Sequence, residues 1–117
     1  MIAEGKKIEE CFSWLKERGY APLTDRFFYK EEDGKLLTVA GVVICIGINS
    51  VYAQIEPMAT EDTKASLEVY NEIIEYLKEH KVQYITAYSS YKRVHHALER
   101  KGWKIFTEDL KQFIKEI

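Results

Sequence analysis

The run from Leu36 to Ile48 constrains the fold of this chain more than any other feature. It is apolar except at Thr38, Gly41 and Gly47, and it is rich in Val and Ile. A strand of this composition is typical of a sheet that is buried on both faces. A helix needs about 20 apolar residues to cross a bilayer, more than this run provides. We therefore expect the central strand of a soluble α/β protein.

Turn signals on both sides of this run predict two neighbouring strands. Asp33-Gly34 precedes the run and is a strong hairpin signal, and Asn49-Ser50 follows it. A short aromatic strand is predicted over 26–30, and another strand over 51–56. The latter is expected to stop at Pro57, because proline cannot donate a hydrogen bond to a ladder. These strands predict an antiparallel meander.

Apolar residues at helical spacing predict helices before and after the meander. The first helix covers 6–19, and a long amphipathic helix begins near Asp62 or Thr63, which can cap it. The elements after that helix are predicted as a strand over 82–88, a helix over 91–101, a strand over 103–106 and a helix over 107–117. The predicted order is α-β-β-β-α-β-α-β-α, which is a mixed, mostly antiparallel sheet flanked by helices in one domain, residues 1–117.

Composition and charge exclude several kinds of protein. Hydrophobic residues make up 46% of the chain, charged residues 31%, and the net charge is -2. These are ordinary values for a globular domain, and they give no general attraction to nucleic acid or to an anionic membrane. Cys11 and Cys45 have no metal-binding spacing, and the adjacent His95 and His96 point in different directions on a helix. We therefore expect a cytoplasmic protein with reduced cysteines, no metal and no membrane contact.

Two short motifs stand at the ends of predicted elements. Ile55-Glu56-Pro57 ends a strand and precedes the long helix, and Gly102-Trp103 follows the next helix. These motifs and the order of the elements resemble the GCN5-related N-acetyltransferase (GNAT) superfamily over residues 27–106. The resemblance implies a GNAT-like fold, an amine as acyl acceptor and acetyl-CoA as acyl donor.

The resemblance also implies a pyrophosphate-binding loop where the long helix begins. The family uses an Arg/Gln-x-x-Gly-x-Gly/Ala loop, whose backbone N–H groups bind phosphate. The corresponding residues, 58–65, contain no glycine and include Glu61 and Asp62, whose carboxylates repel phosphate. The candidate cofactor residues that remain are Thr60, Thr63 and Lys64. We therefore expect no cofactor, with acetyl-CoA reserved for the case that the protein is an enzyme.

The catalytic pattern of the family is incomplete in this sequence. Leu98 stands where many members have a tyrosine acid, four residues before the Gly-aromatic pair. Glu56 lies on the strand that supplies a general base in several members, and Tyr88 is a candidate replacement acid. We therefore expect a non-catalytic GNAT-fold protein, a pseudoenzyme that binds a protein partner or itself. The alternative is a divergent acyl-CoA-dependent N-acetyltransferase.

Two segments are candidate interaction surfaces. The predicted last helix has an apolar stripe that must be buried on its own sheet or on another subunit, formed by Leu110, Phe113, Ile114 and Ile117. The segment 92–104, with Lys92 and Arg93, holds five cations against one carboxylate and has aromatic neighbours. A nucleic-acid-binding accessory protein is therefore a second alternative, although a solvated face is the favoured interpretation. Small proteins that resemble this family are common in tailed phages, so the resemblance also suggests a phage protein carried in a virion.

Overall fold

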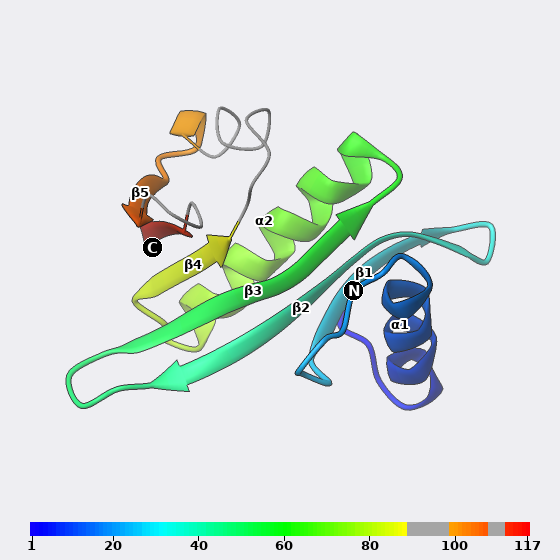
Figure 1. The fold of residues 1–117 in the computed structure, drawn as a ribbon, viewed down its shortest axis with the longest axis horizontal. Coiled ribbons are helices and arrows are strands. Elements are labelled where there is room, and N and C mark those ends of the chain that lie inside the picture. The colour runs from blue at the N-terminus through cyan, green and yellow to red at the C-terminus, as the bar shows by residue number, and fades with distance from the viewer. Residues whose placement is uncertain (89–98, 108–111) are drawn as a thin grey trace.

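A six-stranded sheet organises the molecule, with strands in the order β1-β2-β3-β4-β6-β5 (Figure 1). The protein is seen in a computed structural model that describes residues 1–88, 99–107 and 112–117. Its elements are α1 (Lys6–Glu17), β1 (Phe27–Glu32), β2 (Lys35–Ile46), β3 (Val51–Thr60), α2 (Thr63–Glu79), β4 (Tyr84–Tyr88), β5 (Lys104–Thr107) and β6 (Gln112–Glu116). Only β3 and β4 pair in parallel, and the other neighbours pair antiparallel. The predicted mixed, mostly antiparallel sheet flanked by helices is confirmed.

The predicted meander is present as β1, β2 and β3. Asp33 and Gly34 both have positive φ angles, 52° and 79°, which the tight turn between β1 and β2 requires. At the second turn the backbone N–H of Gly47 donates to the carbonyl of Ser50 at 2.8 Å. β2 therefore lies between two partners, as its unbroken apolar composition predicts.

The prediction that the third strand stops at Pro57 is wrong. β3 continues to Thr60, and Val39 and Ala40 of β2 pair with Ala59 and Met58 beyond the proline. The register between β2 and β3 shifts by one residue at this point. A bulge leaves one residue out of the ladder, so the missing N–H of proline costs no strand hydrogen bond there.

The predicted last helix, 107–117, is also wrong. Among its described residues, Thr107 ends β5 and Gln112–Glu116 form β6, which pairs with β4 on one side and β5 on the other. The backbone of Phe113 and Ile114 pairs with Ala87 and Thr86 of β4. The described residues therefore do not form the helix on which the predicted docking stripe depends. Pairing with a buried strand outweighs an apolar spacing that also fits a helix.

α1 and α2 cover opposite faces of the sheet. Phe28 of β1 belongs to the cluster under α2, whereas its neighbours Phe27 and Tyr29 belong to the cluster under α1, as strand alternation requires. The α2 cluster consists of Phe28, Ala40, Val42, Ala53, Val69, Ile73, Leu77, Val82, Ile85 and Trp103. The smaller α1 cluster consists of Ala3, Cys11, Leu15, Phe27, Tyr29, Val39 and Ala59. Ile117, a residue of the predicted stripe, packs against the α2 cluster of its own chain.

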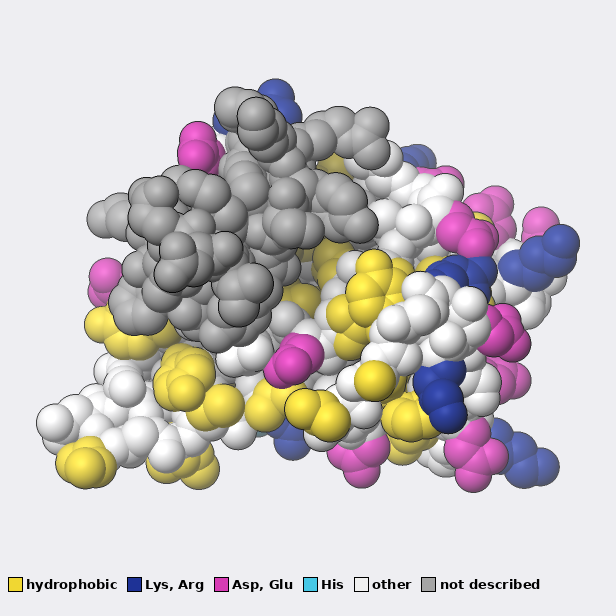
Figure 2. Space-filling view, in the orientation of Figure 1, with side chains coloured by type: hydrophobic (Ala, Val, Ile, Leu, Met, Phe, Trp, Pro, Cys, Tyr) yellow, Lys and Arg dark blue, Asp and Glu magenta, His cyan; other side chains and the backbone are white. Residues whose placement is uncertain are grey.

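The hairpin end of β2 and β3 extends beyond both helices. Hydrophobic side chains lie over this turn, at the lower left of Figure 2, and Ile46 and Ile48 are 83% and 101% exposed. The predicted helix over 91–101 falls mostly outside the described residues; Glu99 and Arg100 are helical. In the described part of the chain, no helix is long and apolar enough to span a bilayer.

Candidate functional site

The sheet opens between β3 and β4. The two strands pair from Tyr52 and Tyr84 as far as Ile55 and Ala87, and β3 then continues to Thr60. Beyond Ile55, β3 remains paired with β2 but has no strand partner on its other edge among the described residues. An unpaired strand edge presents N–H and C=O groups that an extended ligand with amide groups can bind.

A bulge in β3 lies at the point where the sheet opens. Gly41 of β2 faces two residues of β3, Glu56 and Pro57, and the peptide bond between these two is cis. A Cβ atom at Gly41 would lie 2.5 Å from the backbone oxygen of Glu56 and 2.9 Å from Cγ2 of Thr24. Only glycine therefore allows this close approach of the two strands. The sequence contained a signal for it, because a glycine inside an apolar strand often marks a bulge.

The Glu56 carboxylate lies in this bulge. Its side chain is half-buried, and Nε2 of Gln54 donates to its Oε2 at 2.9 Å. Ala53 and Ile55 pack toward α2, so Gln54 and Glu56 lie on the opposite face of the sheet. Oε1 has no hydrogen-bond donor among the described residues. One carboxylate oxygen is therefore held in place while the other can accept a proton.

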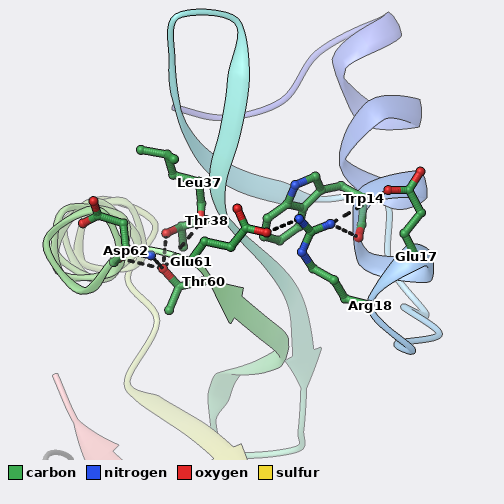
Figure 3. A network of polar contacts seen from close by, with 8 residues as sticks. All are labelled: Trp14, Glu17, Arg18, Leu37, Thr38, Thr60, Glu61 and Asp62. Atoms are coloured by element: carbon green, nitrogen blue, oxygen red, sulfur yellow. Dashed lines mark hydrogen bonds and ion pairs between the residues drawn. The ribbon is translucent and has the colours of Figure 1, made fainter.

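Side chains of the connection between β3 and α2 form hydrogen bonds with its own backbone (Figure 3). Oδ1 of Asp62 accepts the backbone N–H of Ala65 at 3.0 Å and so caps α2, as predicted. Oγ1 of Thr60 accepts the N–H of Asp62 at 3.0 Å and lies 2.6 Å from Oγ1 of Thr38. Thr60, a predicted cofactor residue, is therefore engaged in holding this turn.

Arg18 connects this turn to the end of α1, a contact that the sequence did not predict. Its guanidinium forms an ion pair with Glu61 and lies 3.5 Å from the centroid of the Trp14 ring (Figure 3). Nη1 also donates to the backbone oxygen of Trp14 at 3.0 Å. The local signal is a tryptophan four residues before an arginine at a helix end. The contact with Glu61 spans 43 residues and has no sequence signal.

The remaining predicted site residues are scattered. Thr63 and Lys64 are exposed in the first turn of α2, close to the capping carboxylate. Tyr88 ends β4. Lys92, Arg93 and Leu110 lie outside the described residues. Across the residues that the structure describes, no group of three His, Cys, Asp or Glu side chains is arranged to hold a metal ion.

The comparison with known proteins rests on three solved structures with similar folds. The N-acetylglutamate synthase of Neisseria gonorrhoeae, in complex with coenzyme A and N-acetyl-glutamate, superimposes with a TM-score of 0.68 at 14% identity, covering 98% of this chain and 34% of that one. The ribosomal-protein-S18-alanine N-acetyltransferase of Escherichia coli gives 0.66 at 13% identity, covering 97% and 88%. A GNAT-family acetyltransferase of Listeria monocytogenes gives 0.65 at 12%, covering 94% and 85%. The chain has a GNAT-like fold.

This result corrects the main functional hypothesis. The GNAT-like neighbours are acetyltransferases or an N-acetylglutamate synthase by name, so the comparison contradicts a non-catalytic binding module and favours the alternative, an acyltransferase. No protein-family model and no curated protein sequence matches the chain. At these low identities the likeness describes the fold, and the activity has to be argued from the site.

Coenzyme A, which the GNAT-like fold implies, fits one part of this site and not another. The open edge of β3 suits the amide groups of the pantetheine arm. The first turn of α2 does not suit a diphosphate, because the Asp62 carboxylate already accepts the N–H of Ala65 and occupies the positive end of the helix. The site therefore suits the pantetheine arm of coenzyme A and does not suit its diphosphate.

Proposed function

We propose that this protein is an N-acyltransferase, which moves an acyl group from a thioester such as acetyl-CoA to an amine. The observation that carries the proposal is the opening of the sheet beyond Ile55 and Ala87, with a half-buried carboxylate, Glu56, at its corner. The GNAT-like fold supports the same reaction class. An expected amine acceptor and acyl donor would meet where the two strands separate.

The proposed reaction needs two things from the protein, a proton acceptor and a surface that aligns the acyl donor. The amine nitrogen attacks the thioester carbonyl carbon, a C–N bond forms, and the C–S bond breaks to release the thiol. The nitrogen loses one proton, which the free oxygen of Glu56 accepts, and the departing sulfur gains one from solvent. Gln54 holds the other oxygen of Glu56 at 2.9 Å and so fixes the direction of the proton acceptor. The β3 edge aligns the extended donor beside it.

The test is acetyl transfer from acetyl-CoA to a panel of amines, with the product measured by mass spectrometry. Thiol release is a poorer readout, because Cys45 is itself a partly exposed thiol. A positioned general base contributes a factor of about 10² to 10⁴, so Glu56→Gln is expected to lower kcat by about that factor while leaving the melting temperature unchanged. Glu32→Gln, an exposed carboxylate of β1, is the matched control.

Two results would contradict the proposal. The first is the absence of acetylated product with any amine of the panel, including free amino acids, polyamines and peptide N-termini. The second is equal loss of activity in Glu56→Gln and in the control variant. A loss confined to Glu56→Gln, with thermal unfolding as in the wild type, supports the assigned role.

A further inference from the structure

The β3–α2 connection places a carboxylate of its own at the N-terminus of α2. Between Met58 and Ser66 the sequence holds two carboxylates, Glu61 and Asp62, and one cation, Lys64. The backbone N–H groups at the N-terminus of a helix carry a partial positive charge, which an anion can neutralise. Here Asp62 supplies that anion from the chain itself, through Oδ1 and the N–H of Ala65 at 3.0 Å.

The turn also lacks the glycines of a phosphate-binding loop. A phosphate cradle needs backbone that a ligand can approach, which is why such loops use glycine. Residues 58–65 all carry side chains, and Oγ1 of Thr60 already takes the N–H of Asp62. The N–H groups left without an intrahelical acceptor belong to Thr63 and Lys64, next to the capping carboxylate.

The nearby arginine does not reverse this balance. Arg18 is paired with Glu61, stacks on the ring of Trp14 and donates to the backbone of the same residue (Figure 3). The charges of Arg18 and Glu61 therefore neutralise each other, and the donors of Arg18 are partly used. The carboxylate of the turn that has no such partner is the capping group of Asp62. Lys64 is exposed, and an exposed, mobile cation holds a phosphate weakly.

We infer that the acyl donor is recognised through its acyl-pantetheine arm, at the open edge of β3, and that the nucleotide diphosphate contributes little to binding. This inference rests on the proposed function and names the donor class: uncharged pantetheine thioesters serve about as well as acyl-CoA. The neutral amides of the arm pair with the strand beyond Ile55, and the capping carboxylate of Asp62 occupies the helix N-terminus and repels the diphosphate that follows. The reaction itself is unchanged: the C–S bond of the thioester breaks and the amide C–N bond forms.

The first experiment compares S-acetylpantetheine with acetyl-CoA as donors for the full chain. The inference predicts that kcat/KM for S-acetylpantetheine and kcat/KM for acetyl-CoA lie within about fivefold of each other. The nucleotide diphosphate can raise kcat/KM only if it interacts favourably with the protein in the bound transition state. A preference of about 100-fold or more for acetyl-CoA would overturn the inference and leave the acyltransferase proposal standing. Absence of product with both donors would overturn both.

A second, binding experiment separates these cases further. The melting temperature is measured with added coenzyme A and with added pantetheine, which needs no acceptor amine and no turnover. Equal stabilisation by the two supports the inference. Stabilisation by coenzyme A alone would contradict it, whatever the activity.

The charge argument is tested by the double variant Glu61→Gln/Asp62→Asn. Asparagine caps a helix as well as aspartate does, so α2 keeps its start while two negative charges are removed. We expect kcat/KM for acetyl-CoA to rise by about tenfold at low ionic strength and less in high salt, with no change for S-acetylpantetheine. The control, Glu75→Gln/Glu79→Gln, makes the same charge change at the other end of α2. An equal rise in the control, or no rise in the variant, would refute the assigned role of the turn.

Discussion

The two halves of β3 differ in what lies beside them. Residues 51–55 lie between β2 and β4, whereas residues 56–60 pair with β2 and have no second strand partner among the described residues. The first half is regular, and the second begins with a bulge opposite Gly41. In one strand, therefore, the regular half joins the two parts of the sheet, and the irregular half has one edge outside the described strand pairing.

Both halves contribute to the cluster under α2. Ala53, in the regular half, is fully buried there with Ile85 of the neighbouring strand, and Met58, in the open half, packs against the same cluster. The open half also supplies Ala59 to the smaller cluster under α1, with Cys11 and Val39. We expect changes in the first half to act on stability, and changes in the second to act on activity as well.

The largest effect is expected from Ile85→Ala in β4, opposite Ala53 of the regular half. Ile85 has no exposed surface, and removing a buried side chain of this size lowers the free energy of unfolding by about 2–5 kcal/mol. Urea denaturation followed by tryptophan fluorescence measures the loss, with the largely exposed Ile46→Ala as control. The kcat and KM of the folded protein should stay at wild-type values. A raised KM for the acyl donor would show that the regular half also affects donor binding and not stability alone.

The next effect is expected from Gly41→Ala at the bulge. The new Cβ would lie 2.5 Å from the backbone oxygen of Glu56, and overpacking of this kind costs about 1–3 kcal/mol. The strands must move apart, so Glu56 is displaced and activity falls by more than the loss of folded protein explains. In the control, Gly47→Ala, the nearest atom is 3.4 Å away, which is ordinary contact. Full activity in refolded Gly41→Ala would show that the bulge does not position the site.

The regular half could be predicted from the sequence, and the open half only in part. Local signals, namely the Asp33-Gly34 turn, the apolar run around Val42 and the cap at Asp62, gave the meander and the start of α2. Pro57 was interpreted as a strand end, because a bulge depends on the partner strand as well as on the proline.

Two other features were not predicted from the sequence, for the same physical reason. β6 was predicted as a helix, because the spacing of Phe113, Ile114 and Ile117 is helical, and the pairing with β4 outweighs that local pattern. The ion pair of Arg18 and Glu61 depends on how α1 packs on the sheet. Tertiary contacts, rather than local preferences, thus shape the end of the molecule where we place the function.

A smaller effect is expected from alkaline pH on the cluster under the open half. Burial raises the pKa of the Cys11 thiol to about 11. A group whose pKa is raised by folding stabilises the protein below its unfolded pKa and loses that contribution as the pH rises toward the folded value. At pH 10 the loss is about 1 kcal/mol relative to pH 8. Cys11→Ala should therefore be less destabilising at pH 10 than at pH 8, whereas Leu15→Ala, in the same cluster, should be equally destabilising at both.

The smallest effect is expected from Trp103→Phe, on the α2 side of the sheet. Nε1 of Trp103 donates to the hydroxyl of Tyr70 at 2.9 Å, and a net hydrogen bond of this kind contributes about 1 kcal/mol. Burial raises the pKa of Tyr70, and the hydrogen bond from Trp103 lowers it, so the variant should raise the Tyr70 pKa further. The titration is followed by the ultraviolet absorbance of tyrosinate, with Tyr70→Phe to assign the signal. The Trp103–Tyr70 contact lies on the α2 side of the sheet, so the ratio of kcat/KM for S-acetylpantetheine and acetyl-CoA should not change. A changed ratio would place residues of the α2 side in the binding site for the acyl donor.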